Sequence, residues 1–157
     1  MFLKFNKIFA HCDIPCKIYD PLVAQIAVLT MIRLTDLILE LESSPDSLEN
    51  RHQISRLINE KESQGNIVKD EVRIIWGDYF KDNQIQLFPE VHNLVHLIMQ
   101  DVSKCKQGLS RKNGESLLQN VNDFAKMYWS CKEIKTILKI APYPPGLPIR
   151  LPELSNA

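Results

Sequence analysis

The sequence predicts an all-α protein, an antiparallel four-helix bundle, and three observations carry this prediction. Apolar residues recur at three- and four-residue steps in four stretches, the spacing of one face of an α-helix. No stretch shows the strict alternation or the β-branched clusters that are typical of strands. Short segments join the four stretches, which favours antiparallel neighbours. We therefore expect one domain with an all-α core.

The first two helices are expected over residues 22–41 and 47–79. Asp20 can cap the first helix and Pro21 suits its first turn. Serine, proline and aspartate then interrupt the pattern at residues 43–46. Gly65 weakens the second stretch, but the apolar positions keep their phase across it. We therefore expect one long second helix, bent at Gly65.

The third helix is expected from Pro89 to just before Gly108, and the fourth from Ser110 through Trp129 to Leu138. From residue 141 the composition changes, because five prolines forbid helix and favour an extended, polyproline-like tail: Pro142, Pro144, Pro145, Pro148 and Pro152. A strap on the surface or a loose tail is the expected form. The predicted organisation is a leader at 1–10, a domain at 11–140 and a proline-rich tail at 141–157.

Charge and composition exclude several classes of function. The chain has 157 residues, with 19 Lys and Arg against 19 Asp and Glu, and this balance argues against a general nucleic-acid binder. Charged residues interrupt the most apolar stretch, residues 22–41, so a membrane span is not expected: Arg33, Asp36 and Glu40. We expect neither nucleic acid nor a membrane as a partner.

Residues 1–10, MFLKFNKIFA, form a short basic and apolar leader with two open interpretations. It is either a frayed N-terminus or a pro-segment whose removal exposes His11. Lys4 and Lys7 break the apolar run, which argues against a secretory signal. A cytoplasmic location is therefore expected.

The clearest chemical motif is HCDIPC, residues 11–16, which we call the hook. One histidine and two cysteines within six residues, outside any apolar stripe, indicate metal or redox chemistry. The C-x-x-x-C spacing without a βαβ context fits a metal site better than a redox dithiol. Structural zinc normally takes four side-chain ligands, and the second pair is missing from this motif.

Cleavage between Ala10 and His11 would place a new α-amine one residue from the first thiol. The amine, the amide nitrogen and sulfur of Cys12 and the sulfur of Cys16 then offer two nitrogens and two thiolates in one plane. Such a donor set suits Ni(II) or Cu(II) and disfavours tetrahedral zinc. The His11 imidazole remains able to approach axially, and the anionic donors favour a higher oxidation state. The motif therefore indicates a redox metal.

Two segments carry a family resemblance. HCDIPCKIYDP, residues 11–21, resembles the hook of nickel-containing superoxide dismutase, and so do WGDYFK, residues 76–81, and PEVH, residues 89–92. The similarity spans roughly residues 11–132. It implies an antioxidant enzyme that converts superoxide to O2 and hydrogen peroxide with one nickel ion per subunit. It also implies a four-helix-bundle subunit, a homohexamer and a maturation protease that removes residues 1–10.

The resemblance also assigns roles to residues. It makes His11, Cys12 and Cys16 the nickel ligands. It places three catalytic residues around the metal: Asp13, Tyr19 and Tyr79. Phenols and a carboxylate can fix the hook by hydrogen bonds, restrict the access of anions and organise water for proton delivery.

Some positions depart from the family pattern. Lys17 follows the second hook cysteine, where many members have glycine, so the turn must form without glycine. Ala27 and Gln64 stand where the resemblance implies a carboxylate and an arginine behind the His11 imidazole. A water or another side chain would have to orient that ring instead.

Two other functions compete with the dismutase. A nickel or copper carrier, a metallochaperone, would bind metal at the same hook without turnover and without a free amine. A helical interaction module would carry the Cys/His loop incidentally. Other candidate groups are interpreted as structural: His92 and His96 lack a further ligand, and Cys105 and Cys131 fit small buried apolar positions.

Overall fold

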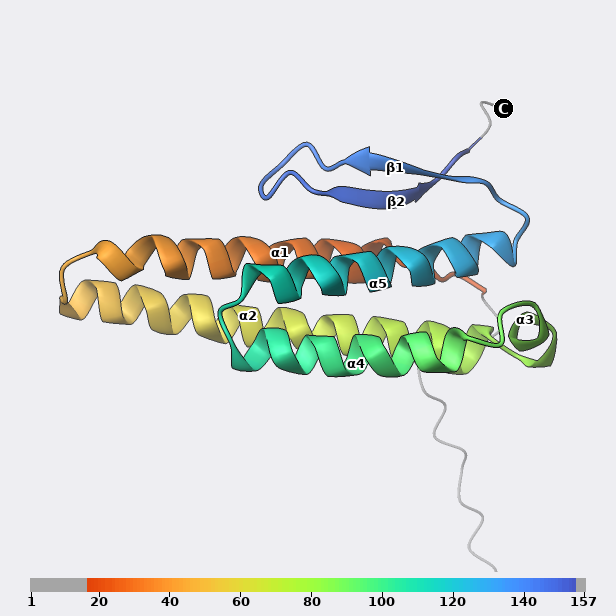
Figure 1. Ribbon diagram of the computed structural model, residues 1–157, viewed down its shortest axis with the longest axis horizontal. Coiled ribbons are helices and arrows are strands. Elements are labelled where there is room, and N and C mark those ends of the chain that lie inside the picture. The colour runs from red at the N-terminus through yellow and green to blue at the C-terminus, as the bar shows by residue number, and fades with distance from the viewer. Residues whose placement is uncertain (1–16, 155–157) are drawn as a thin grey trace, which may run out of the picture.

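The computed structural model describes residues 17–154 and confirms the helical bundle (Figure 1). Four long helices lie side by side with consecutive helices antiparallel: α1 (Leu22–Glu40), α2 (Leu48–Ile74), α4 (Val91–Gln107) and α5 (Arg111–Ser130). The short helix α3 (Asp82–Leu87) lies at one end of the bundle. A β-hairpin of β1 (Thr136–Ile140) and β2 (Pro148–Pro152) lies over α1 and α5.

Helix α1 forms the centre of the core. The Asp20 carboxylate accepts a hydrogen bond from the Leu22 backbone N–H at 2.9 Å, as its capping position predicts. By length and composition alone, residues 22–43 could cross a membrane, with a mean hydropathy of 1.9, contrary to the expectation from the sequence. In this structure 56% of that stretch is buried, and the core helix of a soluble bundle has the same composition. Burial by its neighbours therefore accounts for the apolar character of α1.

Helix α2 runs through Gly65 without interruption, after Ser47 caps its first turn by accepting from the Asn50 N–H at 3.1 Å. A Cβ atom at Gly65 would lie 2.8 Å from side-chain carbons of Lys106 and 3.2 Å from Met31. The glycine therefore allows α2 to pack closely against α1 and α4. The sequence predicts that this helix ends near residue 79. In the structure its last turn, Ile75–Tyr79, is a π-helix, in which the hydrogen bonds span one residue more than in an α-helix.

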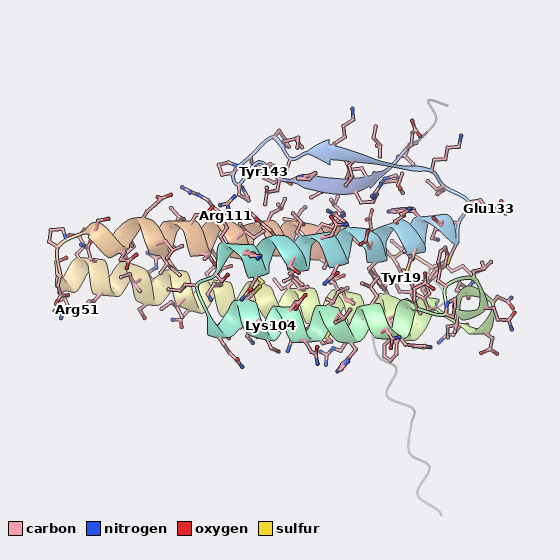
Figure 2. All side chains as sticks on the ribbon, viewed as in Figure 1. Tyr19, Arg51, Lys104, Arg111, Glu133 and Tyr143 are labelled. Carbon is pink, nitrogen blue, oxygen red and sulfur yellow. The ribbon has the colours of Figure 1, made fainter. Side chains whose placement is uncertain are left out.

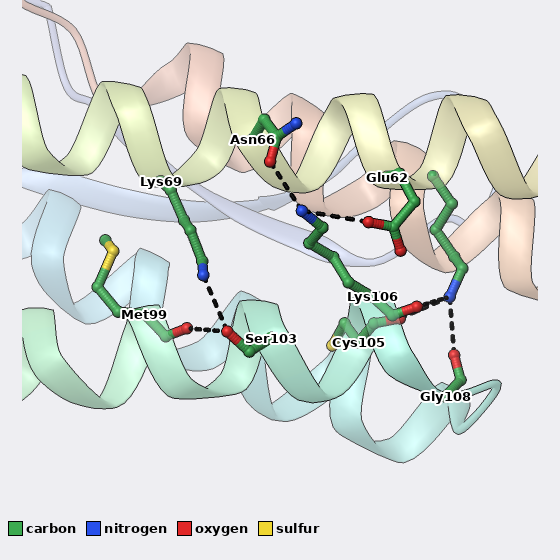
Figure 3. Close-up of polar contacts among 9 residues, drawn as sticks. Glu62, Asn66, Lys69, Met99, Ser103, Cys105, Lys106 and Gly108 are labelled. Carbon is green, nitrogen blue, oxygen red and sulfur yellow. Dashed lines mark hydrogen bonds and ion pairs between the residues drawn. The ribbon is translucent and has the colours of Figure 1, made fainter.

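Polar contacts join α2 to α4 (Figure 3). The Lys106 ammonium contacts the Asn66 side-chain oxygen at 2.8 Å and Glu62 at 3.1 Å, and Lys69 donates to the Ser103 hydroxyl at 2.8 Å.

Lys61 fixes the end of α4. Its side chain is only 2% exposed, and its ammonium donates to the main-chain carbonyls of Cys105, Lys106 and Gly108 at 2.6, 3.0 and 2.8 Å. These carbonyls lie at the C-terminal end of the helix, where a cation is favoured.

The third and fourth helices begin where the sequence predicts. Helix α4 ends at Gln107, before Gly108, and Ser110 caps α5. Two expectations were wrong. Helix α3 lies between the second and third helices that the sequence predicts, where we expected no helix. Helix α5 ends at Ser130 and does not continue to Leu138, because Glu133 adopts a left-handed φ of 59° and the chain turns into β1.

The tail also differs from its prediction. The extended conformation is present, but it pairs with residues 136–140 as an antiparallel hairpin in which Thr136 faces Pro152 and Ile140 faces Pro148. We expected no strand, because the prolines suggested an unpaired tail. Both prolines of β2 stand at the ends of the strand, where a missing N–H is tolerated.

Buried groups attach the hairpin to the bundle. Ile149 of β2 is 5% exposed and belongs to the core. The buried Asn122 side chain accepts from the Arg150 N–H at 2.9 Å and donates to the Pro148 carbonyl at 2.9 Å. Gln25 of α1 donates to both Asn122, at 2.6 Å, and the Arg150 carbonyl, at 3.1 Å. The hairpin is therefore a part of the folded domain.

Candidate metal centre

The structure describes two of the six residues that the sequence predicts for the site. Four of them lie outside the described residues: His11, Cys12, Asp13 and Cys16. Tyr19 and Tyr79 are described, and the structure brings them together from positions 60 residues apart in sequence. Their ring centroids lie 6.2 Å apart with planes inclined at 58°. Tyr19 lies at the same end of the bundle as Glu133 and opposite Arg51 (Figure 2).

A third tyrosine, Tyr128, packs against this pair. Tyr128 of α5 is fully buried, and its ring centroid lies 4.8 Å from that of Tyr79. Its hydroxyl donates to the main-chain carbonyl of Tyr19 at 2.5 Å. We refer to Tyr19, Tyr79 and Tyr128 as the tyrosine cluster. Sequence reasoning missed Tyr128, because its place in an apolar helical stripe predicts only a core residue.

The π-helical turn at the end of α2 positions Tyr79. Phe80 follows the turn, is 3% exposed and packs edge-on against the Tyr79 ring at 5.5 Å. π-Helical turns occur frequently at functional sites because they change the direction of a side chain within a helix. The local structure of the WGDYFK segment therefore anchors Tyr79 at the end of the bundle.

Burial makes the phenols of the tyrosine cluster harder to ionise at alkaline pH. Desolvation raises the pKa of Tyr79 above its ordinary value, and the nearby Cys131 adds to this effect. Desolvation also raises the pKa of Tyr128, with further contributions from Tyr79, Asp20 and Tyr19. Both phenols, already neutral at physiological pH, therefore stay neutral hydrogen-bond donors at a higher pH than an ordinary tyrosine.

Lys132 places a positive charge beside the cluster. Its ammonium lies 5.0 Å from the ring centroid of Tyr79 and 5.2 Å from that of Tyr128, within the range of cation–π attraction. Lys81 of the WGDYFK segment does not provide such a charge at the rings. In the structure the Lys81 ammonium donates to the Gly77 carbonyl at 2.7 Å. Lys132 was missed because nothing in the sequence places residue 132 near Tyr79.

The three departures from the family pattern have definite places in the structure. Lys17 has a φ of 57°, the left-handed conformation that glycine adopts most easily. Ala27 is 2% exposed within the core of α1. Gln64 donates to Glu60 on its own helix at 2.8 Å. The turn after the hook therefore keeps a backbone conformation suited to glycine without having a glycine.

The predicted metal ligands, residues His11, Cys12 and Cys16, lie outside the described range. In the described range 17–154, no group of three or more His, Cys, Asp or Glu side chains could hold a metal ion. His92 accepts a hydrogen bond at Nδ1 from the Trp76 indole at 3.0 Å. The hook offers an imidazole and two thiols in addition to backbone nitrogen, and nitrogen and thiolate donors fit nickel.

The fold is a helical bundle with a small β-hairpin, of the kind found in metalloproteins, and the predicted metal-binding segment precedes its first helix. Residues 6–132 match the sequence model of the family described as nickel-containing superoxide dismutase. The chain therefore belongs to the nickel-containing superoxide dismutase family. Family membership confirms the predicted enzyme class, superoxide as the substrate and nickel as the cofactor.

Individual relatives agree with this assignment. The chain is 30% identical to a nickel superoxide dismutase of Streptomyces seoulensis over 133 residues, which cover 85% of this chain and 96% of the relative. It is 27% identical to the enzyme of Streptomyces coelicolor over 124 residues, or 79% and 89% of the two chains. A solved native nickel superoxide dismutase superposes with a TM-score of 0.69 at 27% identity, covering 78% of this chain and 99% of the other.

Proposed function

We propose that the chain dismutates superoxide at a nickel ion held by His11, Cys12 and Cys16, directly beside the tyrosine cluster. One observation carries this proposal. Tyr19 stands three residues after Cys16, and the Tyr128 hydroxyl fixes its main chain. Three residues span at most about 11 Å, so the Cys16 sulfur lies within reach of the cluster. The proposal applies to the hook residues themselves, which precede the described range.

The donor set supports nickel as the metal at this position. The thiolates of Cys12 and Cys16, an amide nitrogen and the His11 amine would hold the ion, and the His11 imidazole would be a further ligand. When bound, nickel would supply the one-electron redox chemistry that dismutation requires. Two superoxide ions and two protons then yield one O2 and one hydrogen peroxide, so the protein has to supply protons.

The tyrosine cluster supports proton delivery and control of access. The Tyr79 phenol is neutral at physiological pH and burial raises its pKa further, so it can donate a hydrogen bond to water or to a reduced oxygen species. Tyr128 is fully buried and acts by holding Tyr19 in place. Asp13 would fix the hook by hydrogen bonds. Lys132 adds a local positive charge for an anionic substrate, although the chain as a whole has no net charge.

The proposal also includes removal of residues 1–10, assembly into a homohexamer and a cytoplasmic location. Removal of residues 1–10 by a protease would free the His11 amine that the planar donor set requires. The homohexamer is carried over from the family resemblance. A cytoplasmic location is supported by Cys105 and Cys131, the two free cysteines of the described range, since reducing compartments keep thiols reduced.

Paired cysteine substitutions test the hook. In the processed chain, Cys12→Ser and Cys16→Ser should each remove tightly bound nickel and dismutase activity, measured by metal analysis and by superoxide decay after pulse radiolysis. Cys105→Ser is the matched control, because this thiol is buried in the core far along the sequence from the hook. Unchanged activity in both hook variants would refute the proposal. Nickel bound at the hook without any turnover would support the carrier instead.

A further inference from the structure

A groove between α4 and α5 lies on the same part of the bundle as the tyrosine cluster. Its volume is about 420 Å³, and its apolar lining comes from Phe88, Leu94, Leu97 and Met127. Leu97 is 47% exposed, so the groove presents apolar surface to solvent. Helices α4 and α5 are neighbours along this whole edge of the bundle (Figure 1). Within the described chain no segment covers this groove.

We infer that residues 1–10 of the same chain dock in this groove before they are removed. The leader is the segment whose composition matches the groove. Its large apolar side chains would fill the cavity, and they are Phe2, Leu3, Phe5, Ile8 and Phe9. Burying apolar side chains of this size supplies the driving force, at about 25 cal/mol for each Å² removed from water.

Charge complementarity supports the same occupant. Glu90 lies on the α4 side of the groove and Asp123 on the α5 side. The leader carries two lysines and no acidic residue, so Lys4 and Lys7 can pair with these carboxylates. Lys126 also lines the groove and opposes a basic segment, but the two carboxylates outnumber it.

The chain is long enough and is anchored in the right place. Met127 lines the groove, and the next residue, Tyr128, holds the Tyr19 carbonyl at 2.5 Å. One lining residue of the groove is therefore the immediate chain neighbour of the residue that ties down the start of the described chain. The seven residues from 10 to 17 span up to about 25 Å, so the leader reaches the groove without strain.

Docking would hold the metal-ligating residues 11–16 at the tyrosine cluster while the leader is still attached. The inference depends on the proposed function only in taking residues 1–10 as a removable segment. It is tested on the full metal-free chain, without superoxide, so its failure leaves the dismutase proposal untouched.

Methionine methyl signals provide the test. The chain has four methionines, of which Met127 lines the groove and Met31 is 1% exposed in the core. In the full chain labelled with 13C-methyl methionine, the double substitution Phe5→Ser with Phe9→Ser should shift the Met127 signal and leave the Met31 signal unchanged. An unchanged Met127 signal would overturn the inference.

Trypsin provides a second, independent readout, because it cuts after Lys4 and Lys7 only when the leader is released. Leu97→Ser removes apolar lining without adding charge and should speed this cleavage about tenfold, the factor that corresponds to about 1.4 kcal/mol of lost docking energy. Leu48→Ser is the matched control, since Leu48 is 78% exposed at the start of α2 and lies outside the groove. Equal cleavage rates in the full chain and in Leu97→Ser would overturn the inference. So would a Met127 signal that changes with protein concentration but not with the leader substitutions, because it would make a second copy of the chain the occupant.

Discussion

The hydroxyl of Tyr128 donates a hydrogen bond of 2.5 Å to the main-chain carbonyl of Tyr19, joining residues 109 positions apart. This bond ties the segment before α1 to the C-terminal part of α5. Tyr79, from the end of α2, packs against both rings. Side chains from α5 and from the π-helical end of α2 thus fix the chain that leads directly into the hook.

Tyr128→Phe should loosen this attachment. The change removes one hydrogen bond to the Tyr19 carbonyl, so we expect a loss of about 1 kcal/mol in the free energy of unfolding. We also expect faster release of nickel from the processed enzyme, measured with a chromogenic chelator. Tyr143→Phe, on the 42% exposed tyrosine of the hairpin turn, should change neither quantity. Identical nickel release in both variants would contradict the role assigned to Tyr128.

The tyrosine cluster should resist ionisation at alkaline pH. Burial raises the pKa of Tyr79, so its phenol stays neutral as the pH rises past 10.0, the ordinary tyrosine value. The unfolded chain ionises this group first, so the stability contribution is fully present below pH 10.0 and is lost as the pH rises from 10.0 through the folded pKa. Absorbance at 295 nm, compared between the native chain and Tyr79→Phe, should show one late-ionising tyrosine fewer in the variant. Ionisation of Tyr79 below pH 10 would disagree with this account.

Lys17 should be replaceable by glycine but not by a β-branched residue. Its φ of 57° costs an ordinary residue about 1 kcal/mol or more, and glycine avoids this cost. Lys17→Gly is expected to keep or raise nickel affinity, because the turn after the hook forms more easily. Lys17→Val should lower it several-fold, since a β-branched side chain at positive φ is a steric outlier. Equal affinity in both variants, measured by competition with a chelator, would argue against a required left-handed turn.

Lys61→Met should destabilise the bundle strongly. The variant leaves three main-chain carbonyls at the end of α4 without their buried donor, and we expect a loss of about 3 kcal/mol in the free energy of unfolding. Lys69→Met is the matched control, because Lys69 lies on the same helix and donates to a single partner, Ser103. Its expected cost is about 1 kcal/mol, and chemical denaturation measures both. Equal free energies of unfolding in the two variants would contradict this expectation. They would mean that water replaces Lys61 as the hydrogen-bond donor to the three carbonyls.

The sequence predicted the parts of the fold that depend on local signals. The caps at Asp20, Ser47 and Ser110 and the break at Gly108 set the helix ends, and periodicity set the buried faces. The hairpin was missed because pairing of Ile137 with Leu151 depends on a partner that the sequence pattern does not reveal. The apolar residues 134–138 were therefore assigned to the preceding helix.

The candidate site likewise combines residues that the sequence reveals with residues that only the fold brings together. The hook and its donor set are readable because all of the ligand residues are within six positions of one another, and their assignment stays a prediction. The family resemblance placed Tyr19 and Tyr79 around the metal, and the structure brings their ring centroids to 6.2 Å from each other. Tyr128 and Lys132 were missed because their roles arise only when α5 packs against α1 and the end of α2.

The most direct test concerns the amine of His11. Nickel-loaded chain that begins at His11 should show a rhombic low-spin Ni(III) electron paramagnetic resonance signal with axial nitrogen splitting, together with dismutase activity. The full chain, with residues 1–10 attached, should show neither. The same signal and the same activity in the full chain would contradict the claim that a freed terminal nitrogen completes the metal site.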